Sequence, residues 1–148
     1  MPIEIRLRAA TLDDVSMLAM MNQQLIVDEG SQNEMTLDEL KTRMFTWLSG
    51  DRDAVIVERD EDVIGYMLFW HHADEYYPYK DSFYIRQFFI EPRYRRRGIG
   101  QVAFNLIVKH HFADSAAITL DVLQSNPEGK AFWEKLGFYE YHTTMRRE

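Results

Sequence analysis

The chain has 148 residues, of which 46% are hydrophobic and 14% aromatic, as expected for one folded domain over residues 1–148 rather than a disordered segment. It has no cysteine, which excludes disulfides, thiolate metal sites and a cysteine nucleophile. Its net charge of -7 disfavours nucleic acid as a partner, because most of the surface would repel phosphates.

The first residues alternate charged and apolar side chains and lack the apolar core of a signal peptide. No apolar run is long enough to cross a bilayer. We therefore expect a cytoplasmic protein without a membrane partner.

The first half of the chain predicts one strand, two helices and a hairpin. Alternation at period two predicts a strand over residues 3–8. Capping boxes that begin at Thr11 and Thr36 predict helices that reach about Val27 and Gly50. Two apolar strands joined by an acidic turn predict an antiparallel hairpin, with strands at 54–58 and 63–71.

The second half adds strands and helices in alternation. After a tyrosine-rich loop, the pattern predicts a strand at 82–91, a helix at 98–111, a strand at 117–122, a helix at 127–136 and a final strand or hairpin at 138–147. Pro92 ends the first of these strands, and Gly137 caps the last helix. The order βααβββαβαβ predicts a mixed α/β sheet.

The strongest local chemistry lies in the turn between the strand ending at Ile90 and the helix starting at Gly98. Free N–H groups and a partial positive charge at a helix start attract phosphate. Gly98 and Gly100 allow the backbone to approach an anion closely, and neighbouring arginines add charge-assisted hydrogen bonds. The turn predicts a pyrophosphate site, although by itself the motif equally fits a helix entry with a solvated basic face.

The same turn resembles a signature of the GNAT superfamily of N-acetyltransferases, Arg/Gln-x-x-Gly-x-Gly/Ala, which runs here from Arg95 to Gly100. Residues 89–94 resemble its lead-in, apolar-x-Pro-x-Tyr, and residues 126–138 resemble a second signature, Asn...Tyr-Glu-Lys-x-Gly-Phe. The element order matches as well. The resemblance implies the GNAT fold, a twisted, mixed and mostly antiparallel sheet flanked by helices.

The resemblance also implies acetyl-coenzyme A as cosubstrate and no metal. Backbone N–H groups of the turn would hold the pyrophosphate, the strand before it would pair with the pantetheine arm, and Asn126 would contact that arm or its adenosine side. The N–H of Ile90 or of a neighbour would stabilise the oxyanion. The implied cofactor-binding residues are Phe88, Phe89, Ile90, Arg95, Arg96, Arg97, Gly98, Ile99, Gly100, Gln101, Asn126 and Trp133.

The general acid and the general base each have more than one candidate. Trp133 stands where the family often has a tyrosine that acts as general acid and protonates the leaving thiolate. Indole cannot supply that proton, so the alternative role of Trp133 is that of a core aromatic. Tyr139, a tyrosine near Trp133 in the sequence, is another candidate for the general acid. Tyr84 stands where some members have a glutamate base, and it either relays a proton through water or packs. His71, at a strand end, is another candidate base.

The strand at 83–90 resembles that of spermidine/spermine-type acetyltransferases, which carry acidic residues where this chain has Arg86 and Gln87. This departure argues against a polyamine acceptor. Arg86 either faces an acceptor carboxylate or pairs with a structural carboxylate.

Two functions fit the sequence. The first is an acetyl-coenzyme A-dependent N-acetyltransferase that acts on a primary amine of a small molecule or peptide by direct attack. The alternative is a non-catalytic coenzyme A sensor with the same fold, which Trp133 and the absence of an obvious base favour. The resemblance also leads us to expect a homodimer.

Overall fold

The computed structural model describes residues 4–148, and Ile3, the predicted start of the first strand, lies outside the described residues. Five strands form a single sheet in the order β1-β2-β3-β4-β5. Their bounds are Arg6–Ala9, Arg52–Arg59, Asp62–Ala73, Asp81–Ile90 and Ala117–Leu120. The first four pair antiparallel, and β5 pairs parallel to β4. The predicted mixed, mostly antiparallel sheet is confirmed.

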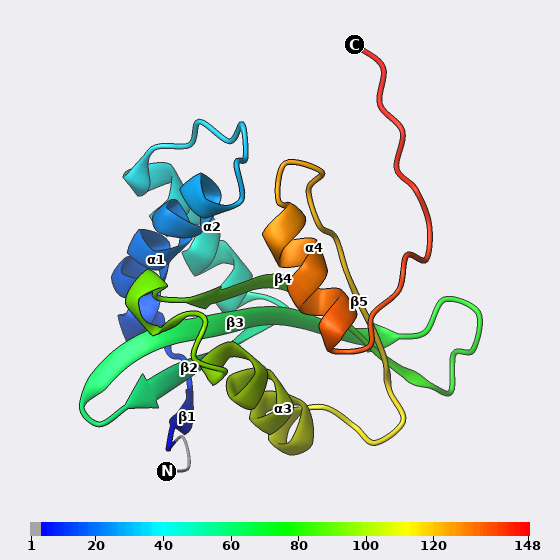
Figure 1. The fold of residues 1–148 in the computed structure, drawn as a ribbon, viewed down its shortest axis with the longest axis horizontal. Coiled ribbons are helices and arrows are strands. Elements are labelled where there is room, and N and C mark those ends of the chain that lie inside the picture. Colours follow the sequence, from blue (N-terminus) through cyan, green and yellow to red (C-terminus); the bar gives the residue numbers. More distant parts are fainter. Residues whose placement is uncertain (1–3) are drawn as a thin grey trace.

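Four α-helices flank this sheet: α1 (Val15–Asp28), α2 (Leu37–Ser49), α3 (Ile99–His111) and α4 (Pro127–Lys135). Both predicted capping boxes form, at Thr11 before a short 3₁₀ turn and at Thr36 before α2. Figure 1 shows α1 and α2 on one side of the sheet and α3 on the other. The helices therefore divide the core into two layers.

The β4 side chains supply both layers, because neighbouring strand residues point to opposite faces. Phe89 packs with Tyr66 and Leu68 in the layer under α1 and α2. Ile85 and Ile90 pack in the layer under α3, with Ile99 and Ile107 of that helix. The central strand is thus buried on both sides.

The prediction of a final strand over residues 138–147 is wrong for the single chain. After Lys135 the chain forms no further helix or strand, and every residue from 139 to 148 is exposed. Figure 1 shows this segment leading away from the body of the molecule. A strand requires a neighbour for its backbone groups, and this segment pairs with no other part of the described chain. The observed order therefore lacks the last strand of βααβββαβαβ.

Candidate functional site

The turn between β4 and α3 has an unusual backbone. Arg96 has a φ of 63° and Gly98 a φ of 77°, both in the left-handed region. Left-handed residues next to right-handed or extended ones turn successive N–H groups toward one point and form a concave site for anions. Arginine rarely adopts this conformation, so the surrounding contacts must hold Arg96 in it.

The N-terminus of α3 differs from those of α2 and α4 in having no side-chain cap. Thr36 caps α2, and Asn126 caps α4 by accepting from the N–H of Gly129 at 3.0 Å. At α3 the first intrahelical bond is from the Val102 N–H to the Gly98 carbonyl, at 3.1 Å. The N–H groups of Ile99, Gly100 and Gln101 are left for an outside acceptor. An uncapped helix start beside a concave turn can bind a phosphate group.

The arginines of the turn have different partners. The Arg95 guanidinium donates from Nη2 to Asp28 Oδ2 of α1 at 2.5 Å and from Nε to the Ile90 carbonyl at 2.6 Å. These contacts tie the turn to α1 and β4, so Arg95 positions the turn. Arg96 and Arg97 are exposed, and the ion pair of Arg96 with Glu128 is between exposed side chains and therefore weak. Their charges are available to an anion.

Beyond residue 85, β4 has an open edge on the side of β5. The β4–β5 ladder ends at the pair Ile85–Leu120, whereas the β3–β4 ladder continues to Gly65–Ile90. The N–H of Glu91 donates to the Ile64 carbonyl at 2.7 Å, and hydrogen-bonded pairs alternate along antiparallel strands. The backbone groups of Phe88 and Ile90 therefore point away from β3, toward the open edge. The Ile90 carbonyl does so, since it accepts from Arg95.

A sequence model of the acetyltransferase (GNAT) family matches residues 19–138, most of the chain. This chain belongs to the GNAT acetyltransferase family. The match covers the turn, the open edge of β4 and both signatures, so the resemblance seen in the sequence is confirmed. Acetyl transfer is the chemistry of this family.

Solved structures agree on the fold of this acetyltransferase. A possible acetyltransferase from Clostridium difficile superposes with a TM-score of 0.79 at 21% identity, over 97% of this chain and 96% of that one. A predicted acetyltransferase from Clostridium acetobutylicum, solved with acetyl-coenzyme A, gives 0.77 at 18% identity, over 98% and 96%. An aminoglycoside N-acetyltransferase in complex with coenzyme A gives 0.76 at 14% identity, over 100% and 96%. No curated protein sequence matches the chain.

Trp133 of this acetyltransferase packs within an aromatic cluster on the α3 and α4 side of the sheet. Its ring centroid lies 5.7 Å from that of Phe88 and 5.7 Å from that of Phe104. Phe132 and Phe138 complete the cluster, at 5.0 Å and 5.3 Å. The contacts fit the core-aromatic alternative, and through Phe88 they support the open edge of β4.

Tyr84 faces a carboxylate. Its hydroxyl donates to Asp121 Oδ2, which directly follows β5, at 2.6 Å. Burial, followed by the bond to Asp121, raises the pKa of Tyr84 to about 12. Tyr84 therefore keeps its proton near neutral pH, so it is a poor base itself but can pass a proton toward Asp121.

Glu29, directly after α1, is a second candidate base. It is partly buried, and burial raises the pKa of its carboxyl although the nearby charge of Arg86 opposes the shift. A base with a raised pKa is better matched to taking a proton from an amine. The carbonyl of Glu29 accepts from Ser125 Oγ at 2.8 Å, which holds this end of α1 against the loop that follows β5.

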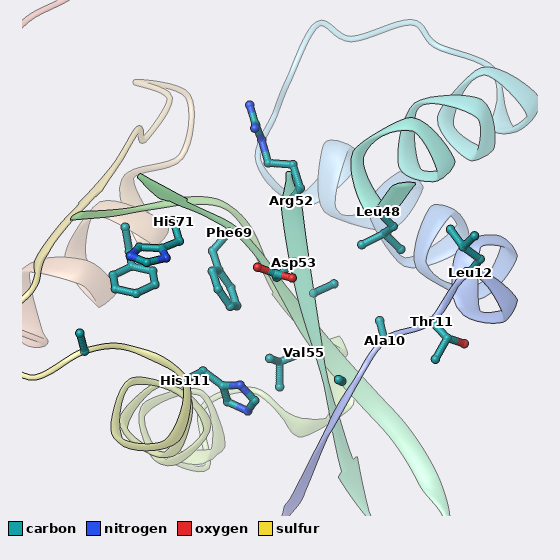
Figure 2. Close-up of a pocket in the computed structure, with 14 residues that line it drawn as sticks. Ala10, Thr11, Leu12, Leu48, Arg52, Asp53, Val55, Phe69, His71 and His111 are labelled. Atoms are coloured by element: carbon teal, nitrogen blue, oxygen red, sulfur yellow. The ribbon is translucent and has the colours of Figure 1, made fainter. Parts of the chain in front are cut away.

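The other two predicted catalytic residues lie elsewhere. His71 contacts Asp81, with 2.7 Å between Nε2 and Oδ1, and lines a cavity of about 480 Å³. Figure 2 shows His71 and His111 in this cavity, at the C-terminal end of α3 and thus a helix length of roughly 20 Å from the turn. Tyr139 is 79% exposed in the C-terminal segment. Neither residue is brought to the turn within the single chain.

Sequence reasoning missed four polar residues near β4: Glu29, Arg43, Trp47 and Asp121. One signal was available, because Arg43 and Trp47 are four residues apart on a predicted helix and share a face. Nothing in the sequence shows that this face meets Arg86. Within residues 4–148, no cluster of three acidic, histidine or cysteine side chains could hold a metal ion, and no helix is long and apolar enough to span a membrane.

Proposed function

We propose that the protein is an acetyl-coenzyme A-dependent N-acetyltransferase that acetylates a primary amine of a small molecule or peptide, in the cytoplasm. The observation that carries the proposal is the uncapped start of α3 beside the open edge of β4. The first suits the pyrophosphate and the second suits the pantetheine arm. The acetyl-coenzyme A and coenzyme A complexes of two proteins of the same fold support the choice of cosubstrate.

The reaction needs no covalent intermediate on the protein. The neutral amine attacks the thioester carbonyl, so that a C–N bond forms and the C–S bond breaks. The Ile90 N–H is oriented to the open edge, where it would donate to the oxyanion. Glu29, or Asp121 through Tyr84, would take the amine proton, and the departing thiolate is protonated from water.

The experiment is coenzyme A thiol release with a panel of amines, in parallel with calorimetric binding of acetyl-coenzyme A. Turnover of at least one amine supports the proposal. Tight binding without turnover of any amine would instead support the coenzyme A sensor, the function favoured by a tryptophan at position 133. Absence of binding would contradict both.

We also propose that the protein is a homodimer. Residues 139–148 are exposed, and β5 pairs with β4 alone in the described chain. An exposed, extended segment and an open strand edge are both suited to pairing with a second copy.

A further inference from the structure

Two guanidinium groups from separate elements share one tryptophan. Arg43 of α2 places its Cζ 4.4 Å from the centroid of the Trp47 ring, and Arg86 of β4 places its Cζ 5.6 Å from the same centroid. This arrangement brings two positive charges together in a chain of net charge -7.

Neither guanidinium has a carboxylate within ion-pair distance among residues 4–148. Arg43 Nη2 donates to the neutral Asn22 Oδ1 at 3.1 Å, and its buried Nε finds no acceptor in the described part of the chain. Burial and the nearby charge of Arg86 lower the pKa of Arg43. By contrast, Arg95, another partly buried arginine, is paired with Asp28. The pair therefore presents unneutralised charge and an unused donor.

Arg43 and Arg86 lie beside the open edge of β4. The β3–β4 register shifts between Leu68 and Phe69, so that Arg86 is the extra residue of a β-bulge next to Gln87. Gln87 accepts from the hydroxyl of Tyr66 in the layer under α1 and α2, which fixes the direction of the bulge. Arg86 is two residues from Phe88, a rise of roughly 7 Å, so its charge lies within reach of a small molecule at the open edge.

Carboxylates of this chain lie near the pair without satisfying it. The charge of Arg86 is close enough to Glu29 and to Tyr84 to oppose the rise that burial causes in the pKa of each. The site thus combines two guanidinium groups that lack an anion with carboxylates that can receive an amine proton.

We propose that Arg86 and Arg43 bind a carboxylate of the acceptor, so that the acceptor is an amino acid or another small amine that carries a carboxylate. This inference rests on the proposed function. Its amine faces Glu29 and the open edge of β4, and its carboxylate accepts hydrogen bonds from the guanidinium groups over Trp47. A planar guanidinium binds a carboxylate through two parallel bonds and stacks on an aromatic ring at the same time.

The test measures thiol release from acetyl-coenzyme A with α-, β- and ω-amino acids and with the carboxamide of each. The best acid should exceed its amide in kcat/KM by roughly 10- to 100-fold, as expected for one charge-assisted interaction. Arg86→Gln should remove most of this preference by raising the KM of the acid. It should change kcat/KM of the amide far less than that of the acid, and it should leave the affinity for acetyl-coenzyme A unchanged. Arg43→Gln should act in the same direction.

The matched control is Arg52→Gln. Arg52 stacks on Trp70 at 4.7 Å but is already paired with Asp51 at 2.5 Å, so its loss should leave the acid–amide ratio as in the parent. Equal rates for acids and amides in the parent would overturn the proposal, as would an equal loss for both in Arg86→Gln.

Failure of the proposed function can be distinguished from failure of the proposed carboxylate site. A chain that binds acetyl-coenzyme A but transfers acetyl to nothing refutes the enzyme, and the carboxylate site is then measured as the thermal stabilisation that amino acids give to the coenzyme A complex. Stabilisation by acids over amides, lost in Arg86→Gln, upholds the site, whereas equal stabilisation by both overturns it.

Discussion

Gly98→Ala separates a pyrophosphate cradle from an ordinary helix start. Gly98 has a φ of 77°, where a residue with a Cβ is strained by about 1–2 kcal/mol. Without ligand the turn can relieve this strain by rotating the substituted residue out of the left-handed region, and ligand binding must then reverse the rotation. Affinity for coenzyme A should therefore fall by roughly 5- to 30-fold, which is the same free energy expressed as a ratio of dissociation constants.

The matched control is Gly137→Ala. Gly137 also has a left-handed φ, 98°, and an added Cβ there would meet nothing within 4 Å. Gly137→Ala should lower the melting temperature by a few degrees, since a domain of this size loses about 2–4 °C per kcal/mol. Gly98→Ala should lower it less, because its turn relieves the strain when no ligand is bound. Only Gly98→Ala should weaken binding, measured by calorimetry. Unchanged affinity in Gly98→Ala, or an equal loss in both variants, would refute the cradle.

Three further predictions follow from the site. Arg95→Gln breaks the partly buried pair with Asp28, so it should lower coenzyme A affinity several-fold and stability by about 1–3 kcal/mol. The control Arg93→Gln should change both quantities little, because its partner Glu91 is partly exposed. Calorimetry measures the affinity of the two variants, and thermal melts measure their stability. Burial raises the pKa of Glu29, so the folded chain retains a proton that the unfolded chain has lost, and stability falls as pH rises from the ordinary value of 4.5 through the folded pKa. Glu29→Gln should therefore be more stable than the parent above that window yet slower in acetyl transfer; melts at several pH values show the first effect, and a variant with parental stability and rate would contradict the role of Glu29. Deletion of residues 139–148 should convert the dimer to a monomer, and light scattering that gives the same mass for both chains would contradict this.

Substitution of Gly100, the other glycine of the turn, is a poor probe of the ligand. A Cβ on Gly100 would lie 3.1 Å from a ring carbon of Phe132. The added methyl group would disturb the contact between α3 and α4, so a change in affinity could not be assigned to the ligand.

Local patterns were sufficient for most of the fold. The capping boxes at Thr11 and Thr36 and the alternation of β2 and β3 act within a few residues of the chain, and these elements formed near their expected bounds. The final strand failed because its formation depends on a neighbour rather than on its own composition. Residues 139–148 have no such partner in the single chain.

The candidate site also has a part that could be predicted from local sequence and a part that could not. The turn at Gly98 was predictable because its glycines and arginines are contiguous in the sequence. The arrangement of Arg43 and Arg86 over Trp47 was not predictable. A β-bulge in β4 and the packing of α2 bring these residues together, and no sequence motif marks either feature. The contact of Arg95 with Asp28 was not predictable either, because the two residues lie 67 positions apart in the chain.

The end of α1 is joined to both halves of the site. Asp28 binds the turn through Arg95, and the neighbouring Glu29 reaches the loop after β5 through Ser125. A change of acceptor that altered this end of α1 would therefore disturb the cofactor side as well. The α2 face that carries Arg43 and Trp47 has no such link to the turn among the described residues. New acceptor specificities should arise, in evolution or in the laboratory, by substitution in α2 while the end of α1 is kept.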